Sequence, residues 1–184
     1  MISEMDFRYC PRCSGRFQKK KENLLLCGKC HFHLYVNPRV TNGIILENEN
    51  EEILLVKRKY PPKRDYWDIP GGFLDFKETI EESMSREMKE ELGLQFHAFK
   101  YFHSYYGTYT FQGLRYHTLC IMFIGKIKHV TRLEPTDDVS EVRFFKWNRV
   151  PFSRLAFVEV RKGIKDYLLS FHQAVRSERA KNQR

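Results

Sequence analysis

The segment from Gly72 to Leu94 concentrates acidic side chains at spacings that suit metal chemistry. It reads Gly72-x5-Glu78-x7-Arg86-Glu87-Met88-x-Glu90-Glu91-x-Gly93-Leu94. Glu87, Glu90 and Glu91 stand at i, i+3 and i+4, so on a helix they share one face and repel one another. A hard divalent cation such as Mg²⁺ relieves this repulsion, because it takes oxygen ligands from carboxylates and substrate phosphates. The competing interpretation is a solvated acidic helix face, which is what most glutamate runs are.

The surrounding residues predict the helix that would position these carboxylates. Thr79 with Glu82 three residues later forms a capping box, which predicts a helix start. An apolar residue recurs every four positions and gives the helix a buried stripe: Ile80, Met84, Met88 and Leu92. Gly93 then stands where a helix commonly ends in a left-handed turn.

The register of this segment resembles the Nudix box of the Nudix hydrolases, which cleave nucleoside diphosphates linked to another moiety. The context agrees, because Tyr66-Trp-Asp-Ile-Pro-Gly-Gly-Phe73 precedes the box as it does in many Nudix proteins. The resemblance extends from Val40 to about Tyr167. It implies an α/β fold, an α/β/α sandwich, in which the predicted helix is one of the layers.

The resemblance also implies which residues hold catalytic Mg²⁺ or Mn²⁺. Glu87 and Glu91 are the expected principal ligands, and Glu90 is a further ligand or a partner through water. The backbone carbonyl of Gly71 or Gly72 is expected to complete the ligand set, since glycine lets the backbone come close to the ion.

Two further positions follow from the family pattern. Arg86 is expected to pair with Glu78 and hold the loop against the helix, although an i,i+4 pair with Glu82 is equally compatible.

In the strand Ser140 to Trp147, Glu141 is the candidate for another metal ligand or for the general base. The runners-up for this role are Asp137 and Asp138, although Asp-Asp in a loop is more often a turn.

Four of the five cysteines form two pairs, Cys10-x2-Cys13 and Cys27-x2-Cys30. This pattern predicts a small ribbon that closes around a structural, tetrahedral Zn²⁺ ion. Disulfides are the rival, and a reducing cytosol disfavours them. His31 and His33 are alternative ligands that four thiolates make unnecessary. Cys120 stands in an apolar strand and is expected to be a small buried hydrophobe.

A zinc ribbon directly before a Nudix domain resembles the NADH pyrophosphatase family, which also removes NAD caps from RNA. The stretch from Cys30 to Pro38 is similar to the link of that family, in which an aromatic residue at the position of Tyr35 contacts substrate. Tyr105 or Tyr106 is a further candidate for stacking on an adenine or nicotinamide ring, but hairpin aromatics often fill the core instead. We expect the chain to lack the larger N-terminal domain of that family. Its Ser-Gln-Pro-Trp-Pro-Phe-Pro stretch after the box is replaced here by His103 to Gly113.

The predicted organisation is a zinc ribbon over residues 1–37, a Nudix hydrolase domain over 38–175 and a basic tail over 176–184. Strands are expected at 40–46, 53–59, 96–104, 117–128 and 141–147, with an aromatic hairpin after the third. A closing helix is expected to bury Val160, Ile164, Leu168, Phe171 and Val175.

The composition sets the remaining expectations. The formal net charge of +9 indicates a polyanionic partner, for which nucleotide phosphates and RNA both qualify. No stretch of about 18 apolar residues or signal peptide is present, so we expect a cytoplasmic protein without a membrane partner. The leading function is hydrolysis of NAD(H) or ADP-ribose. The alternatives are sanitisation of oxidised nucleoside triphosphates, and a nucleotide-sensing or RNA-binding zinc-ribbon module. A nucleotide substrate is the expected partner, and NAD-capped RNA is a further candidate. Resemblance to Nudix enzymes also implies a homodimer.

Overall fold

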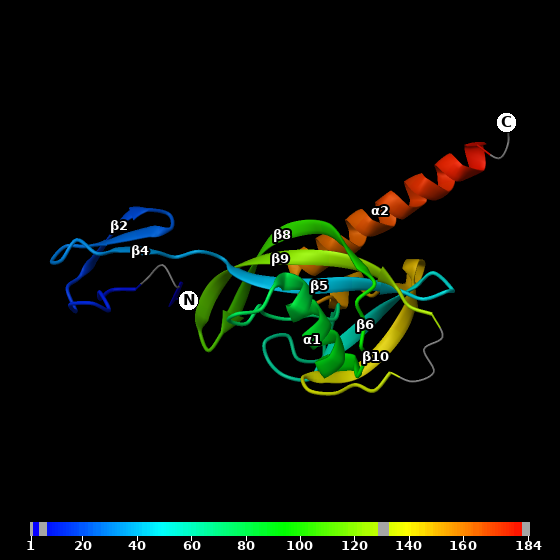
Figure 1. Cartoon of the computed structure of the whole chain (residues 1–184), viewed down its shortest axis with the longest axis horizontal. Helices are drawn as coiled ribbons and strands as arrows, with labels where there is room; N and C mark the ends of the chain where they lie inside the picture. The colour runs from blue at the N-terminus through cyan, green and yellow to red at the C-terminus, as the bar shows by residue number, and fades with distance from the viewer. Residues whose placement is uncertain (1, 4–6, 129–132, 182–184) are drawn as a thin grey trace. The chain divides into compact units, whose positions relative to one another are not determined.

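The computed structural model describes residues 2–3, 7–128 and 133–181, with side chains up to Ser170 (Figure 1). Its contacts divide the chain into two compact units. The first combines Met1–Arg39 with Thr108–Thr118, and the second combines Val40–Gly107 with Leu119–Arg184. The domain limits expected from the sequence stay a prediction, because residues 182–184 and the side chains of Phe171 and Val175 lie outside the description.

The first unit contains the small cysteine ribbon. Its antiparallel sheet has the order β2-β3-β4, with β2 at Phe17–Lys21, β3 at Leu24–Cys27 and β4 at His33–Tyr35. Leu25 and Cys27 point to the same face and are 2% and 0% exposed. This face is the interior of the ribbon. A short strand, β1 (Ile2–Ser3), pairs in parallel with the start of β9.

The second unit is built on the large mixed sheet. Its path through the described chain runs β1-β9-β5-β6-β10, with β8 paired to β9 and β7 paired to β6. The bounds are β5 Arg39–Glu47, β6 Glu52–Arg58, β7 Trp67–Asp68, β8 Phe99–Phe111, β9 Leu114–Lys126 and β10 Val139–Lys146. All five predicted strands are therefore present. The third is longer than expected, because the aromatic residues after Ser104 continue β8 into the predicted hairpin.

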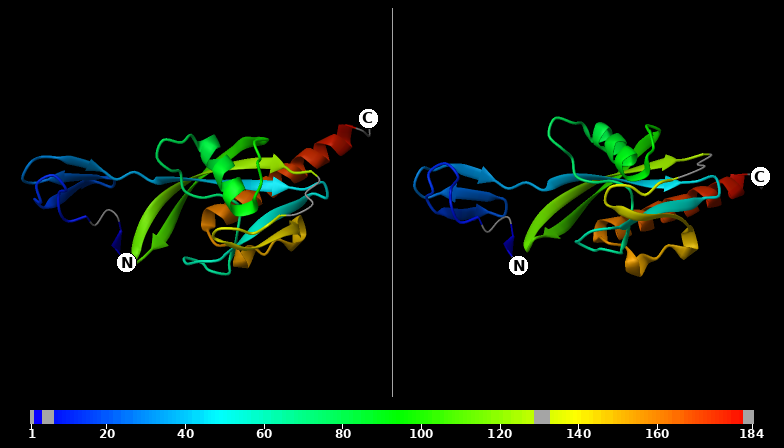
Figure 2. Two further views of the ribbon diagram at one scale, coloured as in Figure 1. Left: turned by 60° about the horizontal axis from the view of Figure 1, so that its bottom comes forward. Right: turned by 90° about the horizontal axis from the view of Figure 1, so that it is seen from below.

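Two helices cover opposite faces of this sheet, as Figure 2 shows. They are α1 (Ile80–Leu92) and α2 (Val158–Lys181), and two short 3₁₀ turns at Trp147–Arg149 and Phe152–Arg154 lead into α2. Ile44, Ile45 and Leu46 of β5 are all 0% exposed. Successive strand residues point to opposite faces, so this unbroken apolar run is what a sheet covered on both sides requires. The predicted α/β/α layering is confirmed.

Each side of the sheet has its own apolar core. Ile44, Leu46 and Leu54 pack with Met84 and Met88 of α1. On the other side a second cluster joins the sheet to the start of α2: Ile45, Leu55, Met122, Leu155, Val160 and Ile164. Fully burying a side chain of this size contributes roughly 1.5–3 kcal/mol, so α1 is fixed mainly by its methionines and Leu92.

The ends of α1 form as the sequence predicts. The Thr79 side chain accepts the Glu82 amide, and the Glu82 side chain accepts the Thr79 amide at 2.7 Å, which completes the capping box. Gly93 ends the helix in the left-handed region at φ 67°. The rotation of α1 about its axis is thereby set by its cap and its methionines together, and this rotation decides where its glutamates point.

Candidate active site

Glu87 and Glu91 stand one turn apart on α1 and are both buried, at 9% and 4% exposure. Burial raises the pKa of Glu87 to about 7, helped by the charges of Glu90 and Asp138 and opposed by Arg86. Burial also raises the pKa of Glu91 well above its usual range, and the charges of Asp138 and Glu87 act in the same direction. The raised pKa values show that the surroundings of the two carboxylates hold too little positive charge to stabilise both in the ionised form. A divalent cation would supply that charge.

The Gly71-Gly72 turn lies directly against these two carboxylates. The Gly71 amide donates to Glu91 Oε2 at 3.0 Å. A Cβ at Gly72 would lie 2.3 Å from Glu87 Oε1, and Gly71 has a φ of 141° that side chains rarely adopt. Only glycine lets the backbone approach the carboxylates this closely. The turn and the two carboxylates of α1 therefore form one cradle, in which the glycine backbone lies against Glu87 and Glu91.

Asn42 fixes this turn to both β5 and α1, a role that sequence reasoning missed. Its backbone N–H donates to the Gly72 carbonyl at 2.9 Å, and its side-chain Nδ2 donates to Ser83 Oγ at 2.7 Å. Both Asn42 and Ser83 are buried. A polar residue inside the predicted strand 40–46 was the available signal, because a buried amide needs partners.

Arg86 is the cation at the centre of the acidic residues. Its Nε and Nη2 donate to both oxygens of Glu78 at 3.1 and 2.9 Å, so the predicted pair is present and bidentate. Arg86 lowers the pKa of Glu78 to about 2. Its Nη1 also donates to Glu87 and Glu90, at 2.8 and 2.9 Å. Glu82 serves the helix cap instead of pairing with Arg86.

The carboxylates of the cradle are less tightly gathered than the cysteines described below. In the described part of the chain, only the four cysteines bring three or more ligand atoms of His, Cys, Asp or Glu within 4.8 Å of one another. Glu87 is drawn to Arg86, and Glu91 to the Gly71 amide. Each buried glutamate thus has its own donor. Buried oxygens beside a glycine backbone fit a hard divalent cation.

Asp138 and Glu141 are placed differently with respect to this cradle. Asp138 raises the pKa of both Glu87 and Glu91 by its charge. Glu141, in contrast, pairs with Lys57 and Arg143, and Lys57 lowers its pKa. Asp137 is exposed, with a φ of 51° in the turn before β10. The charge of Asp138, one of the two runners-up in the sequence, thus acts on the buried glutamates, whereas Glu141 is paired with two cations.

The three tyrosines expected at the substrate have different environments. Tyr105 is 3% exposed and its hydroxyl donates to Asp166 at 2.9 Å, so it is a core residue and its ring is not available for stacking. Tyr106 is 61% exposed, because neighbouring strand residues face opposite sides. Tyr35 is 58% exposed and belongs to the first unit.

Asp68 and Glu159 are buried acids that sequence reasoning did not identify. Asp68 is 8% exposed and pairs with Arg58 at 3.2 Å, and burial raises its pKa to about 6. Its charge also acts on Glu91. Glu159, at 8% exposure in the first turn of α2, lies against Gly107, and burial raises its pKa as well. The sequence could have indicated Asp68, because it is an acid flanked by apolar residues in Trp-Asp-Ile-Pro. No local pattern in the sequence indicates that Glu159 is buried.

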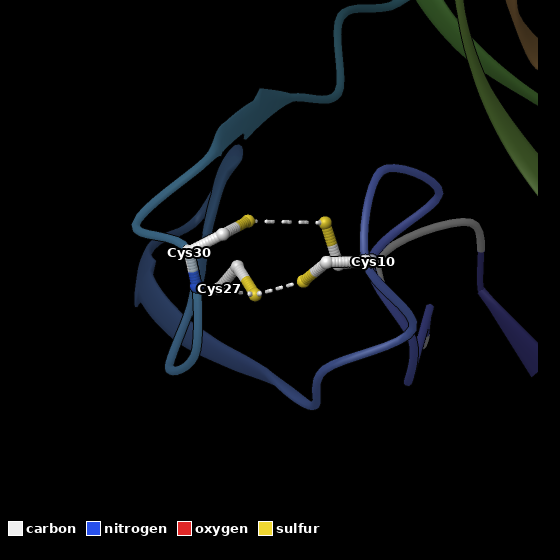
Figure 3. A group of neighbouring side chains, drawn as sticks. Cys10, Cys27 and Cys30 are labelled. Atoms are coloured by element: carbon white, nitrogen blue, oxygen red, sulfur yellow. Dashed lines mark hydrogen bonds between the residues drawn. The ribbon is translucent and has the colours of Figure 1, made fainter.

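The cysteines of the first unit converge as predicted (Figure 3). The sulfurs of Cys10 and Cys30 are 3.8 Å apart and those of Cys13 and Cys27 are 3.5 Å apart, with no disulfide formed. Zinc–sulfur bonds near 2.3 Å give a tetrahedron with edges of about 3.8 Å. Amides of Cys30 and Lys29 lower the pKa of Cys27 to about 6, which favours its thiolate. The cluster fits a zinc ribbon.

The fold and the cradle agree with comparisons to known proteins. The model of the NUDIX domain matches residues 37–168. The chain belongs to the Nudix family. It is 38% identical over 139 residues to an ADP-ribose pyrophosphatase of Methanocaldococcus jannaschii, covering 74% of this chain and 77% of that protein. This Nudix hydrolase therefore acts on pyrophosphate bonds.

Two other relatives extend the comparison. A NAD-capped RNA hydrolase of Vibrio vulnificus is 28% identical to this chain. The match covers 76% of this chain and 50% of that protein. A Nudix hydrolase structure from Nitrosomonas europaea matches 91% of this chain and 93% of its own, with a TM-score of 0.66 and 28% identity. In addition, none of the helices described for this Nudix protein has the length and apolarity to cross a membrane.

The buried glutamates predict an unusual pH dependence for the protein without added Mg²⁺. An acid whose folded-state pKa is raised contributes stability below its unfolded pKa and loses it as pH rises through the folded value. For Glu87 this window runs from its usual 4.5 to about 7. Glu87→Gln should therefore stabilise the protein at pH 8 by on the order of 3 kcal/mol and flatten the pH profile.

Denaturant unfolding between pH 5 and 8, with zinc retained, measures this effect. Glu81→Gln is the matched control, because Glu81 is an exposed residue of the same helix. A wild-type stability that rises with pH over this window, or equal effects of the two variants, would contradict the assignment of Glu87 as a buried acid that Arg86 compensates only in part.

Proposed function

We propose that this chain hydrolyses the pyrophosphate bond of a dinucleotide or sugar nucleotide, with NAD(H) or ADP-ribose as the substrate class. The observation that carries the proposal is the burial of Glu87 and Glu91 beside a glycine turn, which leaves two acids in need of a cation. The relatives named above support the substrate class, since one is an ADP-ribose pyrophosphatase and another a NAD-capped RNA hydrolase.

Glu87 and Glu91 are the proposed main ligands of Mg²⁺ or Mn²⁺, with Glu90 as a further ligand or a partner through water. The Gly72 carbonyl already accepts the Asn42 amide, so the Gly71 carbonyl is the better candidate for the backbone ligand. When bound, the ion screens the phosphate oxygens and acidifies the attacking water. Arg86 pairs with Glu87 and Glu90, so it would compete with the ion for these two carboxylates. It also holds Glu78 through two hydrogen bonds, and this pair would keep the loop of Glu78 in place if Glu87 and Glu90 bound the ion.

Asp138 is the proposed acceptor of the proton of the attacking water. Its charge acts on both buried glutamates, whereas Glu141 is neutralised by two cations. A general base must lie within reach of the water and must be free to take its proton. Glu141 is then a positioning residue that holds Lys57 and Arg143 at the strand edge. Tyr106 and Tyr35 remain the candidates for stacking on a substrate ring.

Removing the metal-binding charge tests the proposed reaction. Glu91→Gln should lower kcat/KM for AMP release from NADH or ADP-ribose by roughly 10²–10³-fold, since charge stabilisation by a held metal ion amounts to several kcal/mol. Glu81→Gln should retain activity. Unchanged turnover in Glu91→Gln would refute the metal assignment. A wild-type preference for 8-oxo-dGTP in the same assay would instead favour sanitisation of oxidised triphosphates.

A pair of isosteric variants separates the two candidate bases. Asp138→Asn should lower kcat by roughly 10²-fold and remove the acidic limb of the pH–rate profile, as expected for loss of general base catalysis. Glu141→Gln should change kcat by less than about threefold. The reverse ranking of the two variants would return the role to Glu141.

The four-cysteine cluster is proposed to bind one structural Zn²⁺ ion. A ribbon of this size buries too little apolar surface to fold alone, so the metal contributes the missing stability. Cys27→Ser should lose the zinc and abolish amide protection across residues 7–39, because Cys27 is the most buried of the four. Native mass spectrometry and hydrogen exchange measure the two effects.

Cys120→Ala is the control for this variant. Cys120 is buried in the apolar core of the second unit and does not belong to the four-cysteine cluster. It should keep the full zinc content. Zinc loss in both variants, or in neither, would contradict the assignment of the four cysteines.

A further inference from the structure

A small open hollow lies at the end of β5, and the proposed hydrolysis uses none of its residues. It has a volume of about 220 Å³, below the roughly 300–1,000 Å³ of sites for drug-sized ligands, so it suits one small ligand. It is lined by Glu47, Glu51, Ile53, Trp147, Tyr167 and Leu168. Glu47 stands two residues after Ile45 on β5 and therefore faces the side of the sheet that α2 covers. The glutamates of α1 belong to the opposite side.

Glu47 is the residue of this hollow that most needs a partner. It is 2% exposed, and among the described residues no hydrogen-bond donor reaches its Oε1. Its other oxygen, Oε2, accepts from the Tyr167 hydroxyl. Lys126 Nζ lies 3.8 Å from Oε1, which is too far for a hydrogen bond, and the Lys126 side chain is 70% exposed. A cationic donor would remove the cost of leaving this buried oxygen without a hydrogen bond.

The other groups of the hollow suit a cation that carries an alkyl chain. Glu51 adds a second, exposed carboxylate. Burial and the hydrogen bond to Glu47 raise the pKa of Tyr167, and the charge of Glu51 acts in the same direction, so both carboxylates act on one hydroxyl. The Trp147 ring is 46% exposed, and the face of such a ring attracts an ammonium group. Leu168 supplies apolar surface for methylene groups.

The turn between β5 and β6 presents Glu51 to the hollow but keeps Glu52 for itself. Asn48 Oδ1 accepts the backbone N–H groups of Asn50 and Glu52, both at 2.9 Å. Asn48 Nδ2 donates to Glu52 Oε2 at 3.0 Å. The Glu51 N–H donates to the Asn48 carbonyl at 3.1 Å, with Glu51 in the left-handed region at φ 60°. Glu52 is therefore a matched control for Glu51, since the two acids are neighbours and only Glu51 lines the hollow.

We propose that this hollow binds a short alkyl diamine, with one ammonium group on Glu47 Oε1 and the other on Glu51. The proposal is independent of the proposed hydrolysis. Because Oε1 is buried, the ammonium group reaches it when the exposed Lys126 side chain turns aside, and Lys126 then competes with the ligand for the same oxygen. A ligand with a single ammonium group, such as a lysine side chain, would satisfy only one of the two carboxylates.

Titration of isotope-labelled protein with 1,4-diaminobutane tests this proposal, with the NMR signal of the Trp147 indole N–H as the readout. Trp67, the other of the two tryptophans, is 7% exposed in the core and provides an internal reference. Trp147→Phe assigns the two signals. The wild type should show a saturable shift at Trp147, whereas 1,4-butanediol, which has the same chain without charge, should produce none.

Variants that remove single charges identify the groups that bind. Glu47→Gln should weaken diamine binding roughly tenfold, since its buried carboxylate is the main anchor. Glu51→Gln should weaken binding roughly threefold, because water screens an exposed charge, and Glu52→Gln should change it by less than about twofold. Lys126→Gln should tighten binding roughly threefold, because it removes the competing cation.

Four results would overturn the proposal. The first is a wild-type protein without a saturable shift at Trp147, and the second is equal weakening by Glu51→Gln and Glu52→Gln, which would show that the general acidity of the turn attracts the amine. The third is weaker binding in Lys126→Gln. The fourth is an equal affinity for 1-aminobutane, which would assign the hollow to a single ammonium group. If Glu47→Gln does not fold, the variants of the exposed residues still decide the result.

Discussion

The burial of two neighbouring carboxylates, Glu87 and Glu91, is the constraint on which the rest of the second unit depends. Buried acids without a cation are costly, and like charges one turn apart add to the cost. A fold can tolerate them only if the surrounding backbone and cap leave them no other position. Here the capping box fixes the start of α1, and Met84 and Met88 fix its rotation against the sheet. The glutamates are therefore directed inward by the same packing that stabilises the helix.

The glycine turn and Arg86 make this arrangement tolerable. The Gly71 amide supplies one donor to Glu91, and Arg86 supplies partial compensation to Glu87. Neither removes the cost, because the pKa of Glu87 is still raised to about 7. A shift of this size corresponds to on the order of 3 kcal/mol, a large part of the 5–15 kcal/mol that holds a typical domain folded. Selection keeps such a cost where it produces a function, and cation binding is the function that removes it.

The sequence predicts these features to the extent that they are local. The capping box, the methionine stripe and the two Cys-x2-Cys pairs depend on short spacings, and each forms as expected. Features that depend on the tertiary fold were less predictable. Tyr105 faces the core because of the strand register, which a long aromatic stretch does not reveal. The charges of Asp138 and Asp68 both raise the pKa of Glu91, and no spacing in the chain predicts that these residues act on the same glutamate.

The positive charges of the second unit follow a simple pattern, in which the position of a cation decides whether it is paired with an acid. Partly buried cations are neutralised by buried or half-buried acids, as Arg58 is by Asp68 and Arg86 by Glu78. The cations of the exposed loop between β6 and β7 stay in contact with water, which screens their mutual repulsion. The two buried glutamates depart from this pattern, because Arg86 offsets only part of the cost of Glu87 and the pKa of Glu91 is raised well above its usual range. They are therefore the place in the second unit where an added cation would gain most.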